Sequence, residues 1–214
     1  MSAELDIVHV DDSLLVLNKP AGLLAVPGRG PDKADCLAAR AQARYPDARV
    51  VHRLDMDTSG LMVMARGGAA QRVLSRAFAV RAVGKRYLAV VGGRLPAPVE
   101  AWGVIDLPLV CDWPNRPRQI VDHALGKPSL TRWRAASYDA ASDTTRVELE
   151  PVTGRSHQLR VHLAALGHPI LGDPLYAPTA LLVRAPRLLL HAWRLAFAHP
   201  ASGETLEFER AARF

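Results

Sequence analysis

The sequence lacks the features that mark several large classes of protein. Its only two cysteines, Cys36 and Cys111, lie far apart and form no C-x-x-C pair, which argues against a zinc site, a redox motif or a disulfide framework. No apolar run reaches the roughly 18 residues that a membrane helix needs, and the N-terminus has no signal-peptide pattern. No G-x-G-x-x-G or Walker sequence is present, so a Rossmann domain is disfavoured. We therefore expect a cytoplasmic protein without a membrane segment.

Acidic residues are the other scarce group. The 27 lysines and arginines exceed the 21 aspartates and glutamates, and the net charge of +6 suits a polyanionic partner such as nucleic acid. Between Thr58 and Val99 there is no acidic residue at all, and the basic residues there are Arg66, Arg72, Arg76, Arg81, Lys85, Arg86 and Arg94. This segment is either a phosphate-facing surface or a solvated face whose acidic partners come from elsewhere in the fold.

Short β-rich runs outnumber the helical stretches. We expect strands at Ile7–Val10, Leu14–Asn18, Val50–Leu54, Leu61–Ala65, Tyr87–Val91, Leu130–Ala135, Arg146–Glu150, Leu188–Phe197 and Thr205–Phe208. Helices are expected at Cys36–Tyr45, Ala69–Val83 and Ser156–Leu166, the last with Ser156 as N-cap and Gly167 after its end. Grouped strands with separate helices predict one α+β domain over residues 1–214, built on a mixed, largely antiparallel sheet.

The first segment that could carry chemistry is HRLDMDTSG, residues 52–60. An acid at the end of an apolar run, beside turn-forming residues, is held firmly yet can face a cleft. The alternative is a purely local role, with Asp55 or Asp57 capping backbone amides. The two carboxylates together would suggest a glycosidase, but the basic composition and an aromatic content of only 6% argue against a sugar cleft.

The second segment is TGRSHQLRVH, residues 153–162. It places Arg155 just before a predicted helix, whose free amides also attract negative charge, so the segment could hold a phosphate or a carboxylate. Alternatively, Arg155 and Arg160 are surface charges. His157 and His162 are five residues apart and so depart from the i, i+4 spacing of H-E-x-x-H, and we expect no metal site.

The third segment is KRYLAVV, residues 85–91, which presents Tyr87 among cations at the start of a strand. Such a ring can stack on a base while a cation such as Lys85 meets a phosphate. Taken alone, Tyr87 is equally a core tyrosine.

These three segments, in this order and at about these separations, resemble the signature segments of the RluA family of pseudouridine synthases. The resemblance continues through residues 18–29, 107–117, 167–176 and 186–192 and covers essentially the whole chain. The outer segments are most similar to the short member that acts on both ribosomal RNA and tRNA. The resemblance implies the pseudouridine synthase fold, in which a mixed sheet with flanking helices bends around a basic RNA-binding cleft. It leaves no room before residue 18 for a separate N-terminal RNA-binding domain.

The resemblance also implies the roles of three catalytic residues. Asp55 would be the catalytic carboxylate, acting as nucleophile or base. Arg155 would pair with Asp55 and keep it ionised. Tyr87 would stack on the target base.

Further residues are implied in RNA binding. Arg53 would fill the space left by a flipped-out uridine. Leu159 would line the base pocket, although its spacing is also that of a core leucine. The other expected RNA contacts are His52, Lys85, Arg72 and Arg76.

The resemblance implies an isomerase that needs no cofactor and no metal. Its partner would be a stem-loop of large-subunit ribosomal RNA, of tRNA, or of both, bound by a monomer in the cytoplasm. The alternative from another class is a noncatalytic RNA-binding protein that has kept the fold. The intact Asp55, Tyr87 and Arg155 favour the enzyme over that alternative.

Overall fold

The computed structural model describes residues 5–30, 33–96 and 102–214, which form two compact units. Unit 1 consists of Met1–Lys85 with His191–Arg213, and unit 2 of Arg86–Leu190 with Phe214. The single catalytic domain expected over residues 1–214 stays a prediction. Across the described ranges, no helix is both long enough and apolar enough to span a membrane.

Unit 1 is built on a mixed sheet with the strand order β1, β2, β4, β11. These strands are β1 (Ile7–Val10), β2 (Leu14–Lys19), β4 (Ser59–Arg66) and β11 (Leu190–Ala198); β3 (Ala48–Val50) pairs with β4 and β12 (Thr205–Glu209) with β11. Every pairing in this unit is antiparallel except that of β4 with β11, which is parallel. The mixed character expected from sequence is therefore present in this unit.

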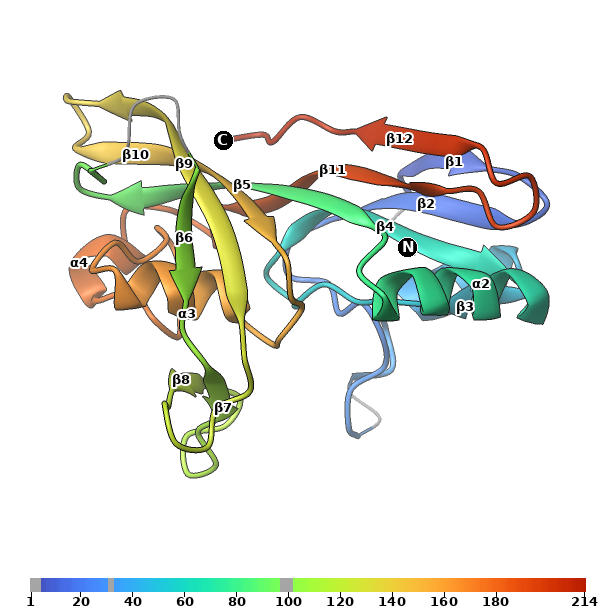
Figure 1. Cartoon of the computed structure of the whole chain (residues 1–214), viewed down its shortest axis with the longest axis horizontal. Coiled ribbons are helices and arrows are strands. Elements are labelled where there is room, and N and C mark those ends of the chain that lie inside the picture. Colours follow the sequence, from blue (N-terminus) through green and yellow to red (C-terminus); the bar gives the residue numbers. More distant parts are fainter. Residues whose placement is uncertain (1–4, 31–32, 97–101) are drawn as a thin grey trace. The chain divides into compact units, whose positions relative to one another are not determined.

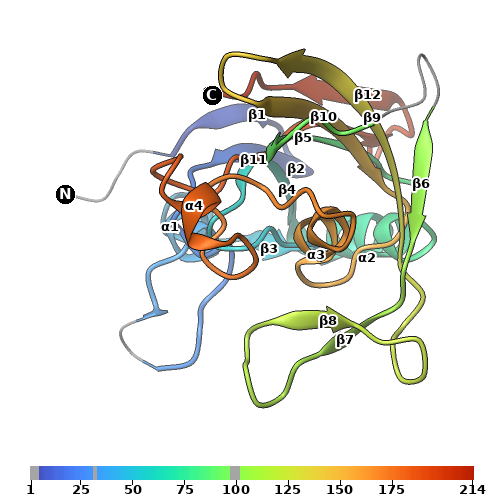
Figure 2. The same ribbon diagram turned by 90° about the vertical axis from the view of Figure 1, so that its left-hand side faces the viewer.

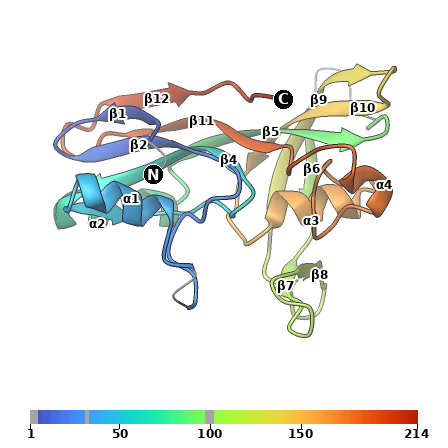
Figure 3. The same ribbon diagram turned by 180° about the vertical axis from the view of Figure 1, so that it is seen from behind.

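The core of unit 1 explains why its central strands read as continuous apolar runs. Almost every residue of β2 and β4 is buried, as expected for strands covered on both faces. Leu14 of β2 and Leu61 of β4 pack in one cluster with Leu74 of α2 (Gly67–Ala79). Figure 3 shows α2 and α1 (Leu37–Arg44) below the strands of this unit.

Unit 2 is built on an antiparallel sheet with the order β5, β10, β9, β6. These strands are β5 (Gly84–Gly92), whose first two residues belong to unit 1, β10 (Thr144–Pro151), β9 (Leu130–Asp139) and β6 (Gly103–Asp106). Helix α3 (Gln158–Ala165) packs Leu159 and Leu163 into a core with Val147 and Leu149 of β10. The short helix α4 (Thr179–Leu182) follows it (Figure 1).

A separate hairpin of unit 2 lies beside α3. It consists of β7 (Leu109–Cys111) and β8 (Gln119–Val121), which pair with each other in a two-stranded sheet. Figure 2 shows this hairpin below α3. The sequence analysis missed both strands, and also β6 and α4.

Several expected boundaries were wrong. The strand expected over residues 50–54 ends at Val50, and residues 51–54 form the loop that leads to β4. Helix α2 ends at Ala79 instead of Val83, because the chain turns there, with Arg81 at φ 62°, to begin β5 at Gly84. Helix α3 is capped by His157 instead of Ser156.

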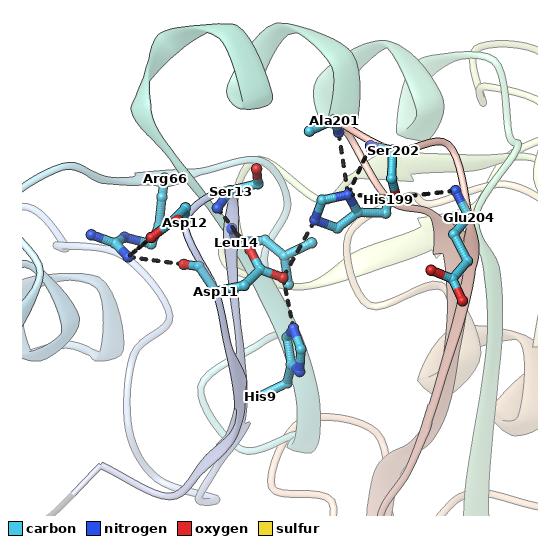
Figure 4. A network of polar contacts seen from close by, with 10 residues as sticks. All are labelled: His9, Asp11, Asp12, Ser13, Leu14, Arg66, His199, Ala201, Ser202 and Glu204. Atoms are coloured by element: carbon cyan, nitrogen blue, oxygen red, sulfur yellow. Dashed lines mark hydrogen bonds and ion pairs between the residues drawn. The ribbon is translucent and has the colours of Figure 1, made fainter.

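One polar network ties two hairpin turns of unit 1 together (Figure 4). The Asp11 carboxylate accepts the backbone N–H groups of Ser13 and Leu14 at 2.7 and 2.9 Å in the turn between β1 and β2. It also meets Nε2 of His9 at 2.7 Å and Nε2 of His199 at 3.3 Å. His199 lies in the turn between β11 and β12, so one carboxylate joins the two turns.

Candidate active site

Asp55 lies in the loop between β3 and β4 of unit 1 and is half-buried. The backbone on both sides of it is anchored, because Leu54 and Thr58 are buried. The N–H of Thr58 donates to the carbonyl of Asp55 at 3.2 Å and closes the turn. The local fold therefore holds the backbone of Asp55 firmly while leaving the residue partly open to solvent.

A buried lysine that the sequence analysis missed fixes this loop. Lys19, the last residue of β2, is fully buried, and its ammonium group donates to the carbonyls of Pro20, Leu23 and Met56 at 2.8, 2.7 and 2.8 Å. Met56 stands between the two aspartates, and its carbonyl also accepts the N–H of Gly22 at 2.9 Å. The segment after β2 and the aspartate loop are thus joined at one carbonyl.

The positive charge of Lys19 is balanced by the two aspartates of the loop, Asp55 and Asp57. Burial lowers the pKa of Lys19 from 10.5 to about 8, while the negative charges of Asp57 and Asp55 oppose this shift. Lys19 therefore keeps its proton at neutral pH, and the loop around Asp55 carries a buried positive charge beneath it.

A glycine sets the start of β4 immediately after the loop. Gly60 has a φ of +116°, and a Cβ atom there would lie 2.3 Å from the carbonyl oxygen of Ala192 in β11. Ser59 beside it contacts Nδ1 of His191 at 2.9 Å through its hydroxyl. Only glycine permits this close approach, which braces the loop against β11.

His52 has a structural task in unit 1. Its Nε2 accepts the N–H of Val63 at 3.0 Å, and its ring stacks on Phe78 at 4.4 Å. Burial lowers the pKa of His52 to about 3, and Lys85 nearby adds to the shift. His52 is therefore neutral at physiological pH and offers no positive charge to RNA, and its expected RNA contact stays a prediction.

The remaining cations predicted for RNA binding in unit 1 differ in exposure. Arg53, Arg72 and Arg76 are exposed, the last two on the same outer face of α2, as their spacing predicted. Lys85 is half-buried, and burial lowers its pKa.

Some basic residues of the segment without acids, residues 58–99, are paired with acidic residues from outside it. Arg66 pairs with Asp47 at 3.2 Å, and Arg86 pairs with Glu148 at 3.0 Å, so acidic partners do come from elsewhere for these two. Residues 97–99, the end of the expected segment, lie outside the described residues. The RNA contacts of Arg72, Arg76 and Lys85 in this segment stay predictions.

Arg155 lies in the turn between β10 and α3 of unit 2, with its side chain exposed. A buried amide, Gln158, holds this turn: its Oε1 accepts the backbone N–H of Arg155 at 3.0 Å and the hydroxyl of Thr153 at 2.7 Å. The Nε2 of Gln158 donates to the hydroxyl of Thr131 at 2.9 Å. The Arg155 side chain donates to the carbonyl of Pro128 at 3.3 Å, so backbone and side chain are both anchored.

The two apolar or aromatic candidates of unit 2 belong to its core. Leu159 is buried in the main cluster, and the half-buried Tyr87 packs against the same cluster. Leu159 thus occupies the position of a core leucine, and its role in lining a base pocket stays a prediction.

The β7–β8 hairpin carries an exposed aromatic and arginines that the sequence analysis did not single out. Trp113 is 66% exposed, and the guanidinium of Arg116 lies 4.5 Å from its ring centre. Arg118 lies over the ring of Tyr176 at 5.4 Å. An exposed ring beside an arginine, as at Trp113, suits stacking on nucleobases and contacts to phosphates. The available signal was the W-P-N-R-P-R run at residues 113–118.

The structure divides the predicted site residues between its two units. Unit 1 holds Asp55, Arg53, His52, Lys85, Arg72 and Arg76, and unit 2 holds Tyr87, Arg155 and Leu159. Within unit 1 the aspartate loop is joined to Lys19, and within unit 2 the Arg155 turn is joined to Gln158.

Comparison with known proteins identifies the class of protein. The family model described as RNA pseudouridylate synthase matches residues 13–165. The chain belongs to this family, whose members are isomerases that convert uridine to pseudouridine in RNA. The isomerase acting on RNA, predicted from the sequence, is thereby confirmed.

Individual relatives cover nearly the whole chain. It is 52% identical over 208 residues to the dual-specificity RNA pseudouridine synthase RluA of Escherichia coli strain K12, covering 97% of this chain and 93% of the relative. The enzyme of the same name from Pasteurella multocida is 50% identical over 211 residues, covering 98% and 94%.

A solved structure confirms the fold. Human RNA Pseudouridylate Synthase Domain Containing 1 matches with a TM-score of 0.78 at 32% identity, covering 97% of this chain and 83% of that one. The pseudouridine synthase fold, with its α+β class and largely antiparallel strands, is therefore the fold of this chain.

Proposed function

We propose that this chain isomerises specific uridines in large-subunit ribosomal RNA, in the tRNA anticodon arm, or in both, as a monomer in the cytoplasm, with Asp55 as its catalytic carboxylate. The observation that carries the proposal is the similarity over 97% of the chain to enzymes named dual-specificity RNA pseudouridine synthase. The anchoring of the Asp55 loop by Lys19 supports the choice of carboxylate, because a catalytic group must be held in place.

The reaction requires a carboxylate and no redox partner. The bond from the ribose to a ring nitrogen of uracil breaks, the base turns, and a new bond forms through carbon 5. The hydrogen on carbon 5 leaves as a proton and the freed nitrogen takes one up, so atoms and electrons balance without a cofactor. Asp55 serves as nucleophile or base in this sequence.

Residues of unit 2 serve the same reaction in the proposal. Tyr87 stacks on the target base, and Arg155 supplies the positive charge that pairs with the catalytic carboxylate and orients it. The anchoring of Arg155 by Gln158 and Pro128 supports this assignment, since a mobile arginine would lose most of that effect. Leu159 lines the base pocket.

The target uridine must leave its stack to be modified, at a cost of a few kcal/mol. Arg53 fills the vacated space; its exposure next to the aspartate loop supports this role. The exposed Arg72 and Arg76 contact phosphates. Lys85 and His52 also contact the RNA, His52 as a neutral ring. Trp113 and Arg116 of the hairpin add a stacking surface.

The test is tritium release from RNA labelled at carbon 5 of uridine, with total ribosomal RNA and total tRNA as separate substrates. The wild-type chain releases tritium from at least one RNA class, and Asp55→Ala reduces release to background. Asp57→Ala is the matched control, because it removes the neighbouring carboxylate of the same loop, and it retains turnover.

Two outcomes contradict the proposal. Full activity of Asp55→Ala would remove Asp55 from the chemistry. Tight RNA binding without release from any RNA would favour a noncatalytic RNA-binding protein instead.

A further inference from the structure

Tyr176 joins two parts of unit 2 that the sequence keeps apart. Its hydroxyl oxygen accepts the backbone N–H of Gln119 in β8 at 2.8 Å. The same oxygen lies 2.7 Å from Nδ1 of His157, the N-cap of α3, so the hydroxyl hydrogen is available to donate to that nitrogen. The two rings meet edge to face, with their centres 5.7 Å apart. One hydroxyl group therefore links the hairpin to the start of α3.

The tyrosine itself is held on a rigid base. Asp173 and Arg160 form a fully buried pair with bonds of 2.6 and 2.8 Å. The Asp173 carboxylate also accepts the N–H of Tyr176 at 3.2 Å, and the Arg160 guanidinium lies 5.1 Å from the centre of the tyrosine ring. Although Arg118 beside β8 also lies over this ring, the hydroxyl is the group of Tyr176 that is hydrogen-bonded to both β8 and His157.

Both ends of the link lie beside proposed functional residues. β8 belongs to the hairpin that exposes Trp113. His157 is two residues after Arg155, and the N–H of Gln158 donates to the carbonyl of Arg155 at 3.2 Å, so the three residues form one turn. His157 has a φ of +54°, a strained conformation for a side-chain-bearing residue, and the bond to Tyr176 helps to hold it.

We propose that Tyr176 is a positioning residue that couples the β7–β8 hairpin to the Arg155 turn, so that RNA docked on the hairpin further stabilises this turn for the reaction. This inference rests on the proposed function of the hairpin and of Arg155. Tyr176 itself touches neither the RNA nor the reacting atoms in this scheme.

Two variants test the link. Tyr176→Phe removes the hydroxyl and keeps the ring between Arg160 and Arg118. His157→Asn removes the ring nitrogen at the other end, and asparagine tolerates the left-handed conformation. Tyr138→Phe is the matched control, because it removes an exposed tyrosine hydroxyl of the same unit that donates to Asp143 at 2.9 Å.

The first readout is the single-turnover rate at saturating RNA, using whichever labelled RNA class the wild-type chain modifies, together with the dissociation constant. Both link variants lower the rate about fivefold, the size expected from one lost hydrogen bond. The double variant is no slower than Tyr176→Phe alone, since both changes break the same link. The control keeps the wild-type rate. An unchanged rate, or weaker binding at an unchanged rate, overturns the coupling.

The second readout does not depend on turnover. Amide hydrogen exchange is followed with and without total tRNA. In the wild-type chain RNA protects the hairpin and also residues 155–158, whereas in Tyr176→Phe it protects the hairpin alone. Equal protection of the turn in both proteins overturns the coupling. A wild-type chain that shows this exchange pattern but releases no tritium would refute the proposed function and leave the coupling standing.

Discussion

The loop that carries Asp55 and the turn that carries Arg155 are both fixed by one buried polar side chain, but by opposite means. Lys19 holds the Asp55 loop with a charged ammonium group that donates to three carbonyls. Gln158 holds the Arg155 turn with a neutral amide that both accepts and donates. The positive charge of Lys19 is balanced by nearby aspartates, whereas Gln158 carries no charge that needs balancing.

This difference follows from what each segment presents. The aspartate loop and the segment after β2 both offer carbonyl groups to Lys19, and the loop carries two carboxylates, so a cation satisfies both needs at once. The Arg155 turn presents an N–H group and already carries an exposed cation, so a buried positive charge beneath it would repel that cation. Burying a charged anchor costs more free energy than burying a neutral one, and losing its partner costs more as well. We therefore expect larger losses of stability at the Asp55 loop than at the Arg155 turn.

The largest loss of folding stability is expected from Lys19→Met. The variant keeps the apolar stem but removes the donor shared by the carbonyls of Pro20, Leu23 and Met56. Among the residues that the structure describes, only the Met56 carbonyl keeps a second donor, the N–H of Gly22, so the free energy of unfolding should fall by about 3 kcal/mol. Urea denaturation at pH 7 measures it. Lys127→Met, at an exposed lysine, is the control and should change little. Equal stabilities of the two variants would show that the charge of the anchor does not matter.

His52 is a neutral anchor at pH 7, and acid would have to protonate it, so the pH dependence of stability shows the cost of placing a charge at this position. Its folded pKa of about 3 lies below the ordinary value of 6.5, so the unfolded chain binds a proton that the folded chain refuses. The stabilising contribution is complete above about pH 6.5 and is lost as pH falls toward 3, by about 1.4 kcal/mol per pH unit.

The comparison for His52 is with His52→Gln, which retains an acceptor for the N–H of Val63 but does not titrate. Urea denaturation from pH 7.5 down to pH 4.5 should show stability falling more steeply in the wild-type chain than in the variant. Parallel curves would mean that His52 takes up its proton in the folded state as easily as in the unfolded one.

Gln158→Leu should have an intermediate effect. It leaves the N–H of Arg155 without its acceptor and should cost about 1–2 kcal/mol, less than Lys19→Met, because no charge is lost. Turnover should fall by more than the loss of folded protein explains, since the turn loosens. Gln42→Leu, at an exposed glutamine whose amide donates to the carbonyl of Ala48 at 3.0 Å, is the control. A larger loss than for Lys19→Met would reverse the ranking.

The sequence predicted most of the strands, because their apolar runs are long enough to recognise. β1 was predicted to the residue and β12 to within one. β7 and β8 were missed since each has three residues and little burial. The N-cap error at α3 arose because a serine is the statistical choice, whereas the chain uses His157 held by Tyr176.

The candidate site was predictable only where its information is local. Asp55, Tyr87 and Arg155 stand in recognisable segments. Lys19 acts on Met56, which is 37 residues away, and Tyr176 acts on Gln119, which is 57 residues away. A single sequence does not show which distant carbonyl or N–H a polar side chain will meet, so these anchoring residues came from the structure alone.

The smallest loss of stability is expected at Asp11, which combines local partners in its own turn with one distant partner, His199. Burial would raise the pKa of Asp11, but the bonds from His9, Ser13 and Leu14 and the proximity of His199 outweigh it and lower the pKa below 3.8. Because the folded pKa is depressed, the stabilisation is present above about pH 4 and is lost as pH falls through the folded value.

Asp11→Asn keeps an acceptor for the turn but removes the charge between the two histidines. It should lower the free energy of unfolding by less than about 1 kcal/mol at pH 7, as for other partly exposed ion pairs. The difference between wild type and variant, measured by urea denaturation, should shrink toward zero below about pH 4, where the carboxylate is protonated in the unfolded chain and then in the folded one. A difference that persists in acid would mean that the hydrogen-bond geometry of the turn, and not its charge, joins the two hairpins.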